Sequence, residues 1–486
     1  MHELNSTLAD IDRRRFLKLG AAGLGGMALA DLEAAQGSTT SHTHRAPDAH
    51  RPPSPHHAPA AKRVIYLFQS GGPSQVDLFD NKPALEKFHG QDIFKLVEQA
   101  GRLTGFTNSH KIHPVINTKY KFARHGENGA SVSELLPHMS QITDEVCTIR
   151  SVSTKPVNHD PALTFMQTGH NLPGRPSIGA WLSYGLGTMN RDLPDFVVLV
   201  SRGDLGNMQP LNNRLWGTGF LSARYAGVRL RSGAEPVLYL KDPASKPITD
   251  RRKILDVINE MNELELARSG DPAVTTRIAQ YEMAFRMQTS VPKLADLSDE
   301  PDSTYKLYGD DARKPGTYAF NCLMARRLAE RDVRFIQLYH SGWDHHFHLP
   351  KALPKRCQET DQASAALILD LKQRGLLQDT IVVWGGEFGR TTFSQSGKVA
   401  ESYGRDHHAN CFTKLVAGGG FKPGLIHGET DDFCYSVVLD EVPVHDLHAT
   451  LMYQLGIDHE RLTFRHQGRD YRLTDVHGKV VKELLV

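Results

Sequence analysis

The sequence predicts an α/β protein in which helices cover both faces of a mostly parallel central sheet. Short apolar runs of the kind found in buried parallel strands recur along the chain, for example at Val64–Phe68 and Ile381–Trp384. Helical periodicity separates such runs, most clearly over Gln358–Leu377, where apolar residues fall on or near one helix face. Strands that alternate with helices are typical of this fold class.

The elements can be placed in order along the chain. The first central strand is expected at Val64–Phe68, where it ends in a Gly-rich polar run. A helix is expected at Thr276–Thr289, and further strands at Phe335–Tyr339 and Phe412–Ala417. No internal repeat and no Pro- or Ser-rich linker follows residue 62. We therefore expect residues 63–486 to form a single domain, with an inserted or peripheral region around residues 193–257.

Composition limits the classes of function. The 486-residue chain is 40% hydrophobic and 23% charged, as in ordinary soluble globular proteins. A net charge of +2 and a pI near 8.2 lack the basic excess of nucleic-acid binders, so nucleic acid is not an expected partner. The five cysteines are widely spaced without a C-x-x-C pair, which makes a zinc–thiolate site improbable and permits one or two disulfides at most.

The N-terminus predicts export. Residues 1–35 contain Arg13-Arg14-Arg15 followed by a Gly-rich, mildly apolar run at Leu19–Ala30, a pattern that resembles a twin-arginine signal peptide. The run is too short and too rich in Gly for a stable membrane span. Residues 36–62 are rich in His, Pro and Ala and are expected to be a disordered linker. The expected location is therefore periplasmic or extracellular.

A Gly-rich loop after a strand predicts a functional site. Gly385, Gly386 and Gly389 allow a sharp turn around Glu387 and Arg390 directly after the apolar strand. Ligands of open α/β sheets bind just beyond the carboxyl ends of strands, which places these two side chains well for metal or anion chemistry. The alternative is a helix-capping Glu and a surface Arg on a tight turn.

Four segments concentrate polar residues at predicted strand ends. Carboxylate and imidazole donors of this kind could hold one or two cations, and Arg390 and Arg405 could clamp an anionic substrate. Exposed His clusters also occur as solvated loops, and Asn158 or Asp160 could simply cap a helix. Besides the Glu387 loop, the segments are Gly71–Asp80, Asn158–Pro161, Trp343–His348 and Gly404–His408.

Several motifs together resemble a secreted bacterial family, domain of unknown function 1501. The motifs are F-Q-S-G-G-P-S-Q-V-D-L-F-D-N-K-P, R-F-I-Q-L-Y-H-S-G-W-D-H-H, G-E-F-G-R-T, G-R-D-H-H and H-D-L-H-A-T-L. The resemblance covers essentially the whole chain after the linker. That family is grouped with the alkaline phosphatase and sulfatase superfamily, whose members hold one or two divalent metals at the strand ends of an α/β/α sandwich. It therefore implies a three-layer, alkaline phosphatase-like fold.

The resemblance also implies roles for single residues. Glu387 stands where sulfatases have a metal-binding Asp, while Phe388 replaces a metal-binding His. His159 falls at the nucleophile position, where it could form a phospho-imidazole or act as a ligand instead. Asp344 and His348 have the D-x-x-x-H spacing of the phosphatase metal site, whereas the family more often has a His at the position of His346. The Asp406-His407 pair resembles the remaining ligands.

The sequence thus predicts an exported, metal-dependent hydrolase of a phosphate or sulfate ester, with a small anionic ester or a sulfated or phosphorylated glycan as substrate. One or two divalent ions are expected, from among zinc, manganese, calcium and magnesium. The alternative is a non-catalytic binding protein on the same fold. The expected catalytic residues are His159, Asn158, Arg390 and Arg405. The expected metal ligands, which should converge in one cleft, are Asp344, His346, His348, Glu387, Asp406 and His407.

Overall fold

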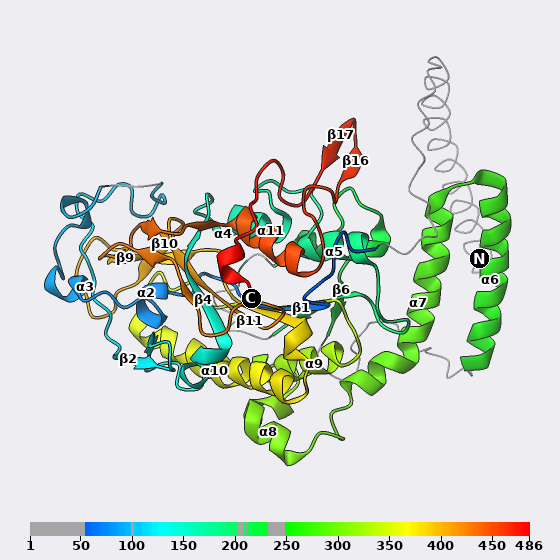
Figure 1. The fold of residues 1–486 in the computed structure, drawn as a ribbon, viewed down its shortest axis with the longest axis horizontal. Helices are drawn as coiled ribbons and strands as arrows, with labels where there is room; N and C mark the ends of the chain where they lie inside the picture. Colours follow the sequence, from blue (N-terminus) through cyan, green and yellow to red (C-terminus); the bar gives the residue numbers. More distant parts are fainter. Residues whose placement is uncertain (1–53, 99–101, 202–208, 210, 232–247) are drawn as a thin grey trace, which may run out of the picture. The chain divides into compact units, whose positions relative to one another are not determined.

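The structure is a computed structural model and describes residues 54–98, 102–201, 209, 211–231 and 248–486 (Figure 1). Residues 53–486 form one compact unit. The expected signal peptide at residues 1–35 and most of the expected linker lie outside the described residues. None of the helices in the described ranges combines the length and the apolarity that a bilayer span requires.

A nine-stranded sheet forms the centre of this unit. The strand order is β12-β4-β11-β8-β1-β7-β5-β6, and β15 also pairs with β4. The strands are β1 (Arg63–Gln69), β4 (Val146–Ser153), β5 (Phe196–Val200), β6 (Val228–Leu230), β7 (Phe335–His340), β8 (Thr380–Gly385), β11 (Phe412–Ala417), β12 (Ile426–His427) and β15 (Val442–Pro443).

The sheet is parallel except at one strand. β1 pairs in parallel with both β7 and β8, so that Leu67 lies between Leu338 and Trp384. Only β11 runs against its neighbours, pairing antiparallel with both β4 and β8. The carboxyl ends of β1, β4, β7 and β8 therefore meet at one edge of the sheet, together with the amino end of β11. This edge carries the predicted polar segments.

Helices cover both faces and complete a three-layer sandwich, which confirms the predicted fold class. Successive residues of β1 point to opposite faces, so Leu67 packs in one core and Phe68 in the other. The first core includes Leu323 of α9 (Tyr318–Ala329) and Leu367 of α10 (Leu349–Gln373). The second includes residues of α4 (His159–Thr168), α5 (Ile178–Leu186) and α11 (Val444–Gln454), which lie on the opposite side of the sheet in Figure 1.

The described chain contains further α-helices and strands outside the main sheet. The helices are α2 (Gln75–Leu78), α3 (Ala84–Lys87), α6 (Ile248–Ser269), α7 (Pro272–Ala295) and α8 (Asp302–Tyr308). The strands are β2 (Phe122–His125), β3 (Ala130–Ser133), β9 (Gly389–Ser394), β10 (Arg405–His408), β13 (Glu429–Thr430), β14 (Val437–Leu439), β16 (Phe464–His466) and β17 (Arg469–Tyr471).

The structure corrects two boundaries taken from the sequence. Phe196–Val200 was expected in a peripheral region but is β5, which pairs with β7 inside the main sheet. Its F-V-V-L-V sequence is fully apolar because both faces of a central parallel strand are covered. Residues 54–62, expected to end the linker, instead pack on the domain. There Ala60 and Ala61 donate backbone hydrogen bonds to Gln454, and His56 donates one to Gly456.

Candidate metal centre

Loops at the carboxyl edge of the sheet bring the predicted site residues together. Asp344 and His346 follow β7, His407 lies in β10, and His159 begins α4. The loop after β7 can approach β1 closely because Gly71 has φ of +118° and no side chain. A Cβ at Gly71 would lie 2.6 Å from the backbone nitrogen of Asp344. This glycine is therefore required where the two strand ends meet.

Three imidazoles and one carboxylate form the candidate metal centre. One donor atom from each of His159, Asp344, His346 and His407 lies within 4.8 Å of the others. The Nε2 atoms of His159 and His346 lie 3.1 and 2.9 Å from the Asp344 oxygens, and Nε2 of His407 lies 3.4 Å away. These four residues come from positions up to 248 residues apart in the sequence, which only the fold brings together.

The other ring nitrogen of each histidine contacts an acceptor of the protein. Nδ1 of His159 lies 2.6 Å from Oε1 of Glu387, and Nδ1 of His407 lies 2.7 Å from the carbonyl oxygen of Val157. Nδ1 of His346 contacts the side-chain oxygen of Gln395. Because these partners accept hydrogen bonds, each Nδ1 carries its proton and each neutral ring presents the lone pair of Nε2. Metal-binding histidines are usually oriented in this way.

The lone pairs create a requirement for positive charge. An unprotonated Nε2 and a carboxylate oxygen are both acceptors, so a proton or a cation must lie between them. Protonating all three rings would place three like charges close together beside the guanidinium of Arg390, which is electrostatically costly. One cation satisfies all three nitrogens and the carboxylate at once. The donor set therefore fits a metal ion.

Electrostatics around Asp344 favour the ionised carboxylate. Burial raises its pKa, but the charge of Arg390 and the close contacts with the three imidazoles hold the pKa of Asp344 well below its usual range. Burial, with the charge of Arg390, lowers the pKa of His407 to about 4. Burial lowers the pKa of His159, but its contacts with Asp344 and Glu387 outweigh burial and raise the pKa overall. In the metal-free protein His159 is thus the ring that holds a proton most readily.

Glu387 lies behind this group of four. Its side chain is fully buried, and both carboxylate oxygens accept from the backbone N–H of Gly71 at 3.0 and 3.1 Å. It contacts the far nitrogen of His159 and does not belong to the group of converging donors. Glu387 was predicted to be a direct metal ligand. In the structure it instead orients His159, which belongs to the converging donors.

Neither predicted arginine clamp faces a substrate. Arg390 is fully buried and uses its donors on Gly71, Gly72, the Arg405 carbonyl and Asp344, the last at 2.5 Å. Arg405 is also fully buried and binds Asp77 through Nε and Nη2, at 2.8 and 3.3 Å. Because both guanidinium groups are buried and bound to protein acceptors, neither is placed to clamp an anion, and a G-R pair in the sequence does not reveal this burial. Both side chains hold the strand ends in place.

Asp406 also supports the centre without joining it. Its Oδ2 accepts hydrogen bonds from Thr104 and Thr107, the latter at 2.8 Å, and its Oδ1 accepts from the backbone of His407. This fixes a loop that places Phe106, which is 59% exposed, with its ring 5.2 Å from that of His346. The predicted ligand role of Asp406 is thus corrected to a loop-positioning role.

Two further predicted residues are not among the four converging donors. His348 is exposed, adopts a left-handed conformation before α10, and donates its backbone N–H to Ser402. Asn158 precedes α4 and makes no side-chain capping hydrogen bond. His348 is therefore not a ligand in this arrangement, although its D-x-x-x-H spacing suggested one. Gln395 and the Val157 carbonyl, which orient two of the rings, carry no signal in the sequence.

Phe388 closes one side of the centre. Its buried ring lies 4.9 Å from that of His159 and 4.5 Å from that of His407. A hydrocarbon ring thus occupies the position where the superfamily resemblance implies a ligand. The remaining side is accessible, since the side chains of His159, Asp344 and His346 are 13 to 16% exposed.

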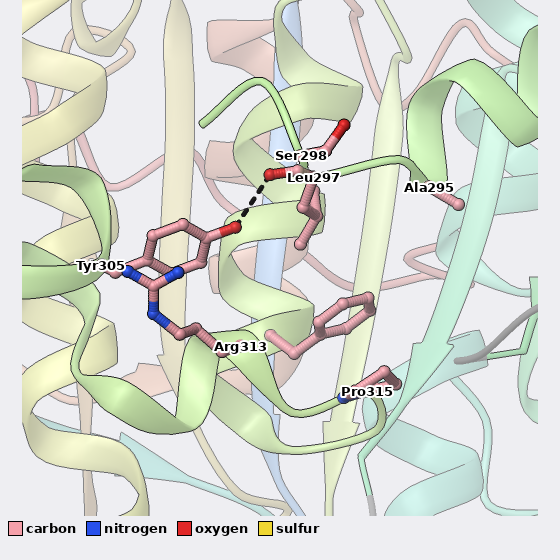
Figure 2. Close-up of a pocket in the computed structure, with 7 residues that line it drawn as sticks. Ala295, Leu297, Ser298, Tyr305, Arg313 and Pro315 are labelled. Carbon is pink, nitrogen blue, oxygen red and sulfur yellow. Dashed lines mark hydrogen bonds between the residues drawn. The ribbon is translucent and has the colours of Figure 1, made fainter. Parts of the chain in front are cut away.

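A separate cavity of about 440 Å³ lies between the end of α7, α8 and the start of α9 (Figure 2). Tyr305 donates to the Leu297 carbonyl there, and Arg313 lies over the Tyr305 ring while pairing with Asp302. The lining contains none of the predicted site residues. It comprises Ala295, Leu297, Ser298, Tyr305, Arg313, Pro315 and Phe320.

Similarity to solved structures is low. A lipoteichoic acid synthase from Listeria monocytogenes gives a TM-score of 0.31 at 10% identity, covering 91% of this chain and 80% of that chain. A sulfatase from Pseudoalteromonas sp. gives 0.31 at 12%, covering 91% and 72%. A phosphonate monoester hydrolase from Silicibacter pomeroyi gives 0.30 at 14%, covering 72% and 71%. Scores at this level support no inference about activity.

Sequence comparison is more decisive. No curated protein matches the chain. Residues 61–485 match the family described as Protein of unknown function (DUF1501). The match spans almost all of the described structure and every residue of the candidate metal centre, and the chain therefore belongs to the DUF1501 family.

Proposed function

We propose that this protein is a metal-dependent hydrolase of small anionic esters, with a phosphate or sulfate ester as substrate. The observation that carries the proposal is the convergence of three histidine Nε2 atoms on the Asp344 carboxylate, with every Nδ1 directed to an acceptor of the protein. The resemblance to the alkaline phosphatase and sulfatase superfamily supports the same class of reaction.

The donor set favours one ion of the zinc type. Imidazole nitrogen is preferred by zinc, iron and similar metals, whereas calcium and magnesium prefer oxygen ligands. Three histidines and one carboxylate match the four ligands of a tetrahedral metal site. Substrate or water would have to bind the metal as a fifth ligand. Phe388 fills the side on which the superfamily has a further ligand, which favours one ion over two.

The chain's own residues would orient and shield the reaction. When bound, the cation supplies Lewis acidity to an ester oxygen and stabilises developing negative charge. Glu387 and Gln395 hold His159 and His346 in the required orientation, and Phe388 excludes water from one side. Nδ1 of His159 is held by Glu387 and its Nε2 is directed into the group of converging donors, so the geometry favours a ligand role over a nucleophilic one. Water is then the attacking group.

The test is to measure metal content and ester hydrolysis in the same preparations. Protein purified without a His tag should contain about one metal ion per chain, and the metal-loaded protein should hydrolyse an aryl phosphate or aryl sulfate. His407→Ala should lower metal content and reduce activity by at least about 100-fold. His348→Ala is the matched control, because this exposed histidine lies outside the converging donors, and it should change neither quantity.

The same experiment separates hydrolysis from simple binding. Phe388 at a ligand position favours a non-catalytic descendant of the fold as the second candidate function. In that case the metal-loaded wild type would hydrolyse none of a broad panel of phosphate and sulfate esters. It would still bind a sulfated or phosphorylated glycan, and chelation would abolish the binding. If neither the wild type nor the His348→Ala control contained bound metal, both proposed functions would be contradicted.

We also propose that the chain is exported by the twin-arginine route. The support is Arg13-Arg14-Arg15 before a Gly-rich apolar run, because this route carries folded proteins and would deliver the protein with its metal already bound. Changing all three arginines to lysine should leave the precursor in the cytoplasm, as measured by fractionation. Undiminished export of that variant would contradict the proposal.

A further inference from the structure

Helix α6 (Ile248–Ser269) carries an exposed apolar stripe. Large apolar side chains on soluble proteins are usually scattered singly, and a contiguous row of them marks an interaction site. Here four such residues recur along a single helix, each at least half exposed. They are Ile254 at 51%, Val257 at 55%, Met261 at 65% and Leu264 at 73% exposure, and we call this set the α6 stripe.

The α6 stripe is not the surface that holds α6 on the protein. α6 packs against α7 through a different side, on which Leu255 is 8% exposed. Arg252 and Asn259 on that side bind Glu282 of α7, with distances of 2.7 and 2.6 Å. The helical hairpin is thus already complete without the α6 stripe, and the stripe is a second apolar surface of the same helix.

The spacing of the α6 stripe is that of a coiled-coil seam. Its members are separated by three, four and three residues, which matches the alternating a and d positions of a heptad repeat. An ordinary helix that packs on a core instead has a wider apolar face. A seam of this width is suited to one partner helix that lies nearly parallel or antiparallel to α6.

The charges beside the α6 stripe specify the direction of the partner. Basic Arg251 and Lys253 flank its amino-terminal end, acidic Glu260 lies beside its centre, and acidic Glu265 flanks its carboxyl-terminal end. In two antiparallel copies, Arg251 of each helix lies beside Glu265 of the other, which makes two pairs of opposite charge, and the two Glu260 side chains make one pair of like charge near the centre. Two parallel copies would instead bring Glu260 of one helix beside Glu265 of the other, with like charges in contact.

We propose that α6 forms an antiparallel coiled-coil contact with α6 of a second copy of this chain. In the matching register, Ile254 faces the partner's Leu264 and Val257 faces the partner's Met261, each pair occurring twice. Arg251 then lies beside the partner's Glu265, also twice. Glu265 already pairs with Arg268 of its own helix and remains 43% exposed, so its carboxylate is accessible to a second cation.

The oligomeric state of the whole chain tests this directly. Sedimentation velocity over a range of concentrations should show a dimer that dissociates on dilution, since one helix pair makes a small interface. Val257→Glu with Met261→Glu should leave only monomer, and circular dichroism should show unchanged helix content because both positions are exposed. Val438→Glu is the matched control, as Val438 is 60% exposed and far from α6 in the sequence. It should remain dimeric.

Charge exchange tests the direction of the helices. Arg251→Glu and Glu265→Arg should each raise the dissociation constant several-fold, and the double variant should restore it. In a parallel pair, Glu265→Arg alone would strengthen the dimer, because it would face Glu260. A monomer at every concentration, a dimer unaffected by the Val257 and Met261 changes, or strengthening by Glu265→Arg would overturn the proposal.

Discussion

Nδ1 of His159 lies 2.6 Å from the carboxylate of Glu387, while Nε2 of the same ring lies 3.1 Å from Asp344. The ring is thus held between two carboxylates with opposite functions. Glu387, which accepts from the backbone of Gly71, fixes the tautomer, and Asp344 belongs to the candidate metal centre. Carboxylate–histidine pairs of this kind orient and strengthen metal ligands.

Glu387→Gln should weaken metal binding without removing it. The amide keeps an acceptor for Nδ1–H but loses the negative charge, and such changes lower metal affinity roughly 10- to 100-fold. Titration against a coloured chelator measures the affinity. Glu86→Gln, at an exposed position, is the control and should leave affinity unchanged. An effect as large as that of His407→Ala would instead indicate that Glu387 binds the metal itself.

Metal binding should release a proton and weaken as the pH falls. Its contacts with Asp344 and Glu387 raise the pKa of His159 although burial opposes them, so the metal-free ring is protonated up to a higher pH than usual. A cation must displace that proton, and its affinity should rise with pH until the pH exceeds this pKa. Calorimetry in buffers of different ionisation enthalpy measures the release. Metal binding without proton release would contradict the raised pKa of His159.

Phe106→Ala should raise KM for aryl esters and leave metal content unchanged. The exposed Phe106 ring lies beside His346 on the loop that Asp406 fixes, and an aromatic stacking contact contributes about 0.5 to 1.5 kcal/mol. KM should therefore rise about 2- to 10-fold. Leu172→Ala, at another exposed apolar position, is the control. An equal increase in KM for an ester with a small aliphatic leaving group would argue against stacking.

Lys414→Met should remove a pH dependence of stability. Lys414 is fully buried, donates to the Tyr66 hydroxyl at 2.8 Å, and burial lowers its pKa to about 7 despite the opposing charge of Glu387. Between pH 7 and 10.5 the unfolded chain holds a proton that the folded chain lacks, so the free energy of unfolding rises with pH.

This single lysine should add up to about 1.4 kcal/mol per pH unit in that window, and nothing below it. Urea unfolding of wild type and Lys414→Met at pH 7 and pH 9 measures the difference in slope. Parallel pH profiles would show that Lys414 is charged in the folded protein.

The sequence by itself determined the strands and the edge at which the site lies. β1, β7, β8 and β11 are mostly apolar runs that are buried on both faces, and their apolar composition indicates such burial from the sequence. Their polar carboxyl ends meet at one edge because the strands are parallel. Asp344, His346 and His407 were therefore predictable as neighbours, although the sequence says little about their orientation.

Only the tertiary structure decided the role of each side chain at that edge. Glu387, Arg390 and Arg405 are polar residues in Gly-rich loops, and their sequence does not reveal that each is fully buried with protein partners. His159 was ambiguous because its two ring nitrogens take their functions from Glu387 and Asp344, which lie more than 180 residues away in the chain. Hydrogen-bond partners at such separations are set by packing, which local sequence does not encode.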